Sequence, residues 1–259
     1  MCLKPGLGLF FAALLFFAVP NSQAHSENPA PPGNLTLDQI VSQIQLRSQL
    51  QDRQLRPYHA LRNYSVVYHG LGTLSAQMQV AVSYDALHGK SFRIVSQSGS
   101  ALLRDAVLKR AVTSEEEASK DKNSTALSSG NYRFALLGND KLNGRPVYIL
   151  SVNPLKPEKF LYRGTVWVDA ANFGIVKIEA SPAKNPSLWI SGTTIWVTDE
   201  LAGGFWLPRE TRSQTRVRLG GTAMLTIDYG QYQFGGAAPA KVQLPQPPDN
   251  KVEARDAAK

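Results

Sequence analysis

The sequence has few of the residues that carry metal or thiol chemistry. Its 259 residues include one cysteine, Cys2, and four histidines. The histidines do not occur as His-x-His or His-Glu-x-x-His, the short spacings found in zinc sites. Disulfide frameworks, cysteine zinc sites and iron–sulfur clusters all need more thiols than this chain has. We therefore expect a protein with no bound metal and no cofactor.

Long apolar runs are also scarce. The one long run covers residues 7–19, with Lys4 before it and Ser22-Gln23-Ala24 after it. A positive start, a short apolar stretch and small residues before a cleavage point are typical of a secretory signal peptide. A membrane-spanning helix needs about 20 apolar residues, more than this run supplies. We expect cleavage after Ala24 and a periplasmic protein whose mature chain lacks Cys2.

Recognisable catalytic patterns are missing. There is no Gly-x-Ser-x-Gly nucleophile motif, and the Ser-x-x-Lys match at 119–122 has no accompanying Ser-Asp-Asn or Lys-Thr-Gly. The carboxylates of the second half are expected on the solvated face of amphipathic strands: Asp169, Glu179, Asp199, Glu200, Glu210 and Asp228. A protein that is not an enzyme is therefore favoured. A hydrolase using Asp169, Glu179 and Glu210 on neighbouring strands remains the least favoured alternative.

The charge is positive but spread along the chain. There are 28 Lys and Arg residues against 20 Asp and Glu residues, a net charge of +8 that falls to +7 if the leader with Lys4 is removed. The basic residues form no single block, and no DNA- or RNA-binding motif accompanies them, so we expect no nucleic-acid partner. Attraction to anionic lipid head groups is the more natural use of this charge.

Composition divides the chain into four parts. Residues 1–24 are the expected signal peptide. Residues 25–35 and 235–259 are rich in proline and polar residues, which predicts a disordered linker and a disordered C-terminal tail. Residues 36–234 contain no Pro/Gly/Ser linker, which favours one domain over two.

Two segments have helical periodicity. A capping-box pattern at Thr36 and Gln39 precedes apolar residues at helical spacing, and Pro57 closes the segment. A second helix is predicted over residues 100–118, where Leu103 and Val107 lie four residues apart. The polar residues 119–130 that follow are expected to form a mobile loop.

The rest of the domain has the alternation of half-buried strands. Residues 73–84 alternate apolar and polar side chains almost throughout, so one face is buried and the other is solvated. Further strands are predicted at 64–69, 90–96, 131–137, 146–153, 164–169, 175–180, 187–197, 205–218 and 222–234. Gly and Asn occupy the intervening turns at 143–144, 172–174, 203–204 and 220–221, as tight hairpins require. The pattern predicts a long antiparallel meander.

Three segments resemble a known family. The hairpin of residues 166–179 (VWVDAANFGIVKIE) is similar to the Trp-x-Asp, Gly, hydrophobic-x-hydrophobic-Glu hairpin of periplasmic outer-membrane lipoprotein-sorting proteins, the LolA/LolB/RseB-like superfamily. Residues 142–150 (LNGRPVYIL) and 204–209 (GFWLPR) resemble the strands that flank it there. The resemblance covers roughly residues 36–234, and the hairpin is its most specific motif.

The resemblance implies a fold and a function. The fold class would be α+β, mainly β: a strongly curved antiparallel sheet, an unclosed half-barrel, with helices covering its concave face. The function would be to carry lipid or lipoprotein acyl chains across an aqueous compartment, and the expected oligomeric state is a monomer. Related sensors restrain envelope-stress regulators, so an interaction module with an envelope membrane protein as partner is the alternative. The functional arginine of the carriers is not assigned to any residue here.

Strand phase identifies the side chains expected to face the acyl chain. A long curved sheet with little helical cover tends to leave an apolar hollow. The expected lipid-binding residues are Leu74, Met78, Val80, Val82, Phe134, Leu136, Tyr148, Leu150, Val166, Val168, Val176, Ile178 and Trp196. The phase of residues 187–197 is ambiguous, because large apolar side chains occur in both phases, and some members of the set are expected to be filled core beneath the helices.

Overall fold

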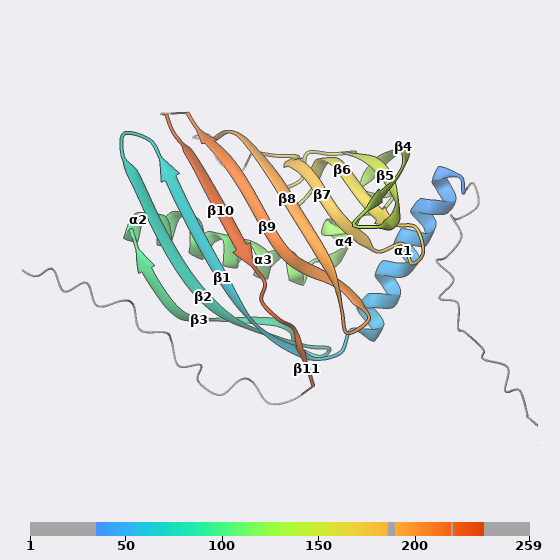
Figure 1. The fold of residues 1–259 in the computed structure, drawn as a ribbon, viewed down its shortest axis with the longest axis horizontal. Helices are drawn as coiled ribbons and strands as arrows, with labels where there is room; N and C mark the ends of the chain where they lie inside the picture. The colour runs from blue at the N-terminus through green and yellow to red at the C-terminus, as the bar shows by residue number, and fades with distance from the viewer. Residues whose placement is uncertain (1–34, 186–189, 219, 236–259) are drawn as a thin grey trace, which may run out of the picture. The chain divides into compact units, whose positions relative to one another are not determined.

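A computed structural model describes residues 35–185, 190–218 and 220–235, and these all belong to one compact unit. The expected signal peptide with its cleavage point, most of the predicted linker and nearly all of the predicted tail lie outside the described residues. One antiparallel sheet organises the described part of the chain (Figure 1).

The sheet has eleven strands in the described residues. They are β1 (Tyr58–His69), β2 (Thr73–Asp85), β3 (Gly89–Gly99), β4 (Tyr132–Leu142), β5 (Arg145–Pro154), β6 (Tyr162–Asp169), β7 (Ile175–Pro182), β8 (Ile190–Ala202), β9 (Phe205–Val217), β10 (Thr222–Asp228) and β11 (Gln233–Phe234). The spatial order is β3-β2-β1-β10-β9-β8-β7-β6-β5-β4, with β11 paired to β1. The two edge strands, β3 and β4, do not pair, so the curved sheet stays open as a half-barrel.

Helices cover the concave face. Helix α1 (Leu37–Gln54) begins with the predicted capping box, in which Thr36 and Gln39 each accept the other's backbone N–H. The chain between β3 and β4 forms α2 (Ala101–Leu103), a π-helical turn η1 (Arg104–Leu108), α3 (Lys109–Lys120) and α4 (Lys122–Thr125). The second predicted helix is therefore confirmed, with a π turn inside it. The loop predicted over 119–130 is partly wrong, because α4 lies within it.

Two apolar clusters hold the helices to the sheet. In the first, Leu103, Leu108 and Val112 pack on β1, β2 and β10. In the second, Ile40 and Ile44 of α1 pack on β4, β5 and β6. Fully burying an aliphatic side chain contributes roughly 1.5–3 kcal/mol, so each cluster is a substantial part of the core.

The alternation predicted for β2 is confirmed: Ala76, Met78, Val80 and Val82 are buried, and the residues between them are more exposed. The predicted last strand is interrupted. β10 ends at Asp228, and Gly230 takes a φ of 64°, a conformation that favours glycine. A Cβ at Gly230 would lie 2.2 Å from the carbonyl oxygen of Leu61 on β1. The chain passes so close to β1 at this point that only glycine fits. The chain returns to the sheet as β11, opposite Tyr58 and His59.

Candidate functional site

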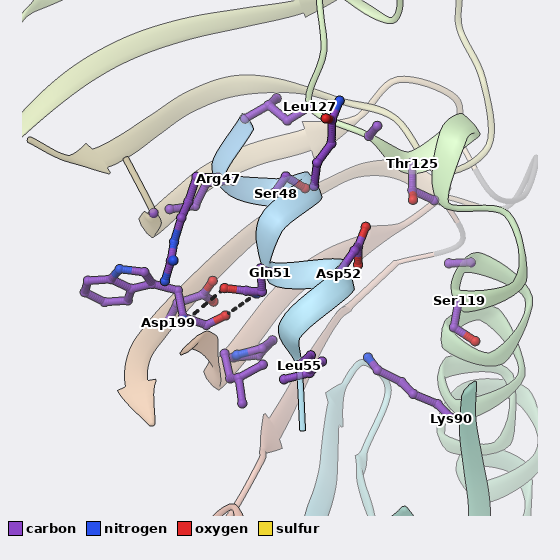
Figure 2. A pocket seen from close by; sticks show the side chains of 18 of the residues that line it. Arg47, Ser48, Gln51, Asp52, Leu55, Lys90, Ser119, Thr125, Leu127 and Asp199 are labelled. Carbon is purple, nitrogen blue, oxygen red and sulfur yellow. Dashed lines mark hydrogen bonds between the residues drawn. The ribbon is translucent and has the colours of Figure 1, made fainter. Parts of the chain in front are cut away.

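A cavity of about 980 Å³ lies between α1, the α3–α4 segment and the sheet (Figure 2). This is within the range of small-molecule sites, roughly 300–1,000 Å³. The side chains around it come from three parts of the chain. They include Ile44, Arg47, Ser48, Gln51 and Asp52 from α1 and Leu55 just after it, Tyr58, Tyr84, Lys90, Tyr162, Asp199 and Trp206 from the sheet, and Glu115, Ser119 and Thr125 from the α3–α4 segment with Leu127 just after it. Polar and apolar groups both face this space, so it fits an amphiphile better than a bare hydrocarbon.

The polar character of α1 changes along one helical face. Ile40 and Ile44 are buried in the second apolar cluster. Ser48, one turn further along, lies on the same face because residues i and i+4 are stacked, and it lines the cavity. The first half of the helix is therefore packed in the core, and its second half lines the cavity.

Gln51 ties the end of α1 to β9. Its Nε2 donates to the carbonyl oxygen of Trp206 at 2.9 Å, and its Oε1 accepts the N–H of Trp206 at 3.2 Å (Figure 2). The indole Nε1 of Trp206 donates to Oδ1 of Asn172 at 2.7 Å. A Cβ at Gly174 would lie 1.9 Å from the same indole, so glycine leaves the room that the ring needs. Helix, strand and turn are thus locked together at this end of the cavity.

Aromatic rings form part of the wall. Tyr58 and Tyr84 lie on neighbouring strands and stack with their ring centroids 5.4 Å apart. Tyr162 and Phe173 contribute further rings to the lining. Such rings offer large apolar surfaces to a ligand.

A buried ion network lies beside the cavity. Arg62 on β1 is 1% exposed, and its Nη1 donates to Oε2 of Glu115 at 2.7 Å. Lys90 donates to the other oxygen of Glu115 at 3.1 Å. Burial by itself would raise the pKa of Glu115, but the positive charges of Lys90 and Arg62 outweigh it and hold that pKa below its ordinary value. The guanidinium of Arg62 also lies 4.4 Å from the ring centroid of Tyr229. The network fixes α3 to the sheet.

Asp199 is the unusual charge in the cavity wall. It lies where the pairing of β8 and β9 shifts register. Its Oδ1 is buried and has no hydrogen-bond partner in the part of the chain that the structure describes. Burial raises the pKa of this carboxyl to about 7, even though Lys90 acts in the opposite direction. The expectation of a solvated carboxylate is therefore wrong for Asp199.

The same expectation is wrong for Asp169, which is 1% exposed. Its Oδ1 accepts the N–H groups of Ala171 and Asn172, and its Oδ2 accepts from Nε of Arg145 at 2.7 Å. This carboxylate therefore shapes the hairpin turn. Glu179 and Glu210 point to the opposite side of the sheet from the cavity, since both belong to the strand phase of Trp196. Glu179 is opposite Thr165, four residues along β6 from Asp169, so the three carboxylates of the hydrolase alternative are not brought together.

None of the side chains predicted to face an acyl chain lines the large cavity. Met78, Val80 and Val82 are buried in the first apolar cluster. Tyr148, Leu150, Val166 and Val168 are buried in the second, with Phe134 and Ile178 packed against it. Val176 belongs to a third, smaller cluster with Val147 and Trp206. Leu74 and Leu136 are about two-fifths exposed, at 41% and 40%. These residues mostly fill the space beneath the helices, and a lipid-binding role for them stays a prediction.

Trp196 lies on the convex face, apart from the rest of the predicted set. It is opposite Glu179 on β7 and Arg212 on β9, whereas its neighbours Ile195 and Val197 are opposite Ala180 and Ile178, members of the concave phase. With Thr198, Glu210, Arg212 and Met224 it lines a separate groove of about 380 Å³. Large apolar residues on both sides of β8 made its phase ambiguous in the sequence.

The sequence analysis missed the polar wall: Arg47, Gln51, Lys90, Glu115 and Asp199. One signal was available. Ser48 and Gln51 continue the face begun by Ile40 and Ile44, and an apolar stripe that turns polar before the helix ends marks a change in what the helix faces. Nothing comparable in the sequence pointed to Asp199.

Metal-ligating residues do not gather within the ranges that the structure describes, where no group of three His, Cys, Asp or Glu side chains is placed to hold an ion. His69 Nδ1 shares a hydrogen bond with Thr73, and His88 Nδ1 lies 3.0 Å from Asp85 in an exposed turn. No helix among the described residues has the length and apolar character needed to cross a membrane.

Comparisons with known proteins give similarities at low identity. No family model and no curated protein matches the chain. A DUF1329 family protein from Desulfovibrio piger is 14% identical, with 76% of this chain and 95% of that chain covered and a TM-score of 0.39. A putative outer membrane lipoprotein-sorting protein domain from Vibrio parahaemolyticus is 12% identical, with coverage of 75% and 91% and a TM-score of 0.36. A LolA superfamily protein from Nitrosomonas europaea is 12% identical, with coverage of 76% and 94% and a TM-score of 0.33.

Proposed function

We propose that this protein is an exported, non-enzymatic carrier that binds a lipid or lipoprotein acyl chain in the cavity between α1, the α3–α4 segment and the sheet. The observation that carries the proposal is the cavity itself, about 980 Å³ beneath two helical covers. Each methylene moved out of water contributes about 0.8 kcal/mol, so a chain of about ten methylenes gains roughly 8 kcal/mol before the cost of ordering it. No catalytic group is needed for such binding.

The lining modifies the purely apolar hollow expected from the sequence. Ile44, Leu55, Leu127 and Phe173 offer apolar contacts, while Arg47, Gln51, Lys90 and Asp199 are polar. A chain lying against the first group would bring its polar end within reach of the second. The proposed cargo is therefore an amphiphile held by both of its parts.

A blocked cavity tests the proposal. Ser48 lies on the cavity face of α1, and Gln43 is exposed on the same helix without lining the cavity. The chain is expressed with its leader and purified from the host periplasm. Native mass spectrometry and organic extraction then measure bound acyl lipid in the wild type, Ser48→Trp and Gln43→Trp.

We expect acyl lipid on the wild type and on Gln43→Trp, and its loss from Ser48→Trp, with equal melting temperatures for the three proteins once they are delipidated. Displacement of the neutral fluorophore N-phenylnaphthylamine by added lipid should follow the same ranking. A wild-type protein that carries no acyl lipid and binds no fluorophore would contradict the proposal. So would equal occupancy of the two tryptophan variants.

The convex groove supports the alternative, an envelope sensor that binds a membrane protein. Trp196, Arg212 and Met224 line it, and tryptophan and arginine are among the residues enriched in the hot spots of protein–protein interfaces. Recovery of one stable envelope protein with the wild type but not with Trp196→Ala, together with an empty cavity, would favour this function over the carrier.

A further inference from the structure

One carboxylate in the cavity wall lacks the partner that its burial requires. Oδ1 of Asp199 is shielded from solvent and accepts no hydrogen bond within the described residues. Leaving a buried acceptor unsatisfied costs about 1–3 kcal/mol, and more for a charged group. A buried acceptor that stays unsatisfied within the protein is a candidate for contact with a ligand, because the ligand can supply the missing hydrogen-bond donor.

Neither nearby cation hydrogen-bonds to Oδ1 of Asp199. Lys90 is close enough to influence Asp199, yet its ammonium is bound to Glu115 at 3.1 Å. Arg47 donates from Nη2 to the carbonyl oxygen of Gly204, while its buried Nε has no acceptor among the described residues, Asp199 included. Asp52, on α1, adds a further carboxyl to the lining. The protein's own cations thus leave Asp199 as the acceptor facing the space where a ligand would lie.

We infer that the cavity selects amphiphiles whose head group donates a hydrogen bond, with a primary ammonium as the strongest case, and that Asp199 receives that donor. This inference rests on the proposed carrier function. A hydrogen bond from an ammonium to a carboxylate is roughly twice as strong as one between neutral groups, so amine head groups should bind more tightly than hydroxyl head groups. A carboxylate head group would place a second negative charge beside Asp199 and should bind worst.

Three probes with the same alkyl chain isolate the head group: dodecylamine, dodecanol and dodecanoate, each below its solubility limit and, for the two ionic probes, below the critical micelle concentration. Their affinities are measured at pH 8 by displacement of N-phenylnaphthylamine from the full mature chain. The variants are Asp199→Asn, which keeps the shape of the side chain, and Asp140→Asn, the same exchange at an exposed position outside the cavity lining.

We expect wild-type protein and Asp140→Asn to bind dodecylamine about tenfold more tightly than dodecanol, and dodecanoate most weakly. In Asp199→Asn the amine should bind within about twofold of the alcohol, and dodecanoate should gain affinity, because the new amide donates. The N-phenylnaphthylamine affinity should stay the same in all three proteins.

The outcomes distinguish a failure of the head-group inference from a failure of the proposed carrier function. An unchanged amine preference in Asp199→Asn would overturn the inference and leave the carrier function standing. If no probe displaces the fluorophore, or the fluorophore does not bind, the carrier function fails as well. Should Asp199→Asn not fold, the wild type alone still decides, because dodecanoate binding as tightly as dodecylamine would overturn the inference.

Discussion

The two helical covers of the sheet differ in how completely they are packed. The cover formed by α2, η1 and α3 presses Leu103, Leu108 and Val112 into the sheet and adds the bridge from Glu115 to buried Arg62. Helix α1 is packed only through its first half, where Ile40 and Ile44 meet the second apolar cluster. Its second half faces the cavity and is tied to the sheet by polar contacts such as those of Gln51.

The difference indicates that the cover formed by α2, η1 and α3 stabilises the fold, whereas the second half of α1 is available to contact a ligand. Packed apolar contacts stabilise the folded state whether or not a ligand is bound, whereas a polar wall over an open space gains its full contacts only with an occupant. Substitutions under α3 should therefore change stability most, and substitutions along the end of α1 should change it least.

Leu108 under the first cover should show the largest effect. It is fully buried, and Leu108→Ala leaves a hole that the close-packed cluster cannot fill, which should lower the free energy of unfolding by about 4 kcal/mol. Ile44→Ala, beside the existing cavity, should cost about half as much. Leu102→Ala, 66% exposed on the same helical segment, is the control and should cost under about 0.5 kcal/mol. Urea unfolding of the three variants measures the ranking, and equal losses at Leu108 and Ile44 would remove the distinction between the covers.

The ion network should rank second. Glu115→Ala leaves the buried guanidinium of Arg62 without its carboxylate partner, so we expect the free energy of unfolding to fall by about 3 kcal/mol at pH 7. Because folding lowers the pKa of Glu115, its contribution is present above the unfolded value of about 4.3 and is lost as the pH falls through the folded value. The variant should therefore lose less stability than the wild type on acidification.

The matched control for this exchange is Glu117→Ala on the same helix, where the glutamate pairs with Lys159 at the surface. Exposed pairs contribute about 0–1 kcal/mol, so its unfolding curves should stay close to the wild type at every pH. A loss at Glu117 equal to that at Glu115 would show that burial of Arg62 is not what makes the bridge important.

The sequence was enough to predict most of the sheet, because its evidence is local. Alternation in residues 73–84 and the Asn-Gly turn at 143–144 each depend on neighbouring residues, and the structure confirms both in β2 and in the β4–β5 hairpin. The break after Asp228 depends instead on the contact of Gly230 with Leu61, far apart in the chain, and the prediction of one continuous strand there was wrong.

The position and the lining of the cavity could not be predicted from such local patterns. Alternation separates the two faces of a strand but does not say which part of the buried face a helix covers, so the predicted residues fall mainly in the filled clusters. Trp196 shows a second limit, because β8 carries large apolar side chains in both phases. Asp199 shows a third: it shares the concave phase of Ile195 and Val197, but no spacing in the sequence reveals that its Oδ1 is shielded there without a hydrogen-bond partner among the described residues.

Asp199 should give the third effect, with the opposite pH dependence to Glu115. The folded carboxyl holds its proton up to about pH 7, while the unfolded one releases it near pH 4. Its contribution to stability is therefore full below about pH 4 and is lost as the pH rises through about 7. Asp199→Asn should remove this slope and be more stable than the wild type by about 2 kcal/mol at pH 8. This is roughly half the full linkage value, because the residue as a whole is only half-buried although its Oδ1 is shielded. Thermal unfolding from pH 5 to 8 measures it, and parallel curves for the two proteins would contradict a buried carboxyl.

Gln51 should show the smallest effect and so define the weaker cover. Gln51→Ala removes both hydrogen bonds to the backbone of Trp206 at the rim of the cavity, where water can replace them, so we expect a loss of about 1 kcal/mol. Gln43→Ala, exposed on the same helix, should lose almost nothing. Because these bonds hold the cavity end of α1, bound N-phenylnaphthylamine should also dissociate faster from Gln51→Ala than from Gln43→Ala in stopped-flow measurements. A loss as large as that of Leu108→Ala would mean that the end of α1 is as much a part of the core as α3, and that the cavity lies under a fixed cover.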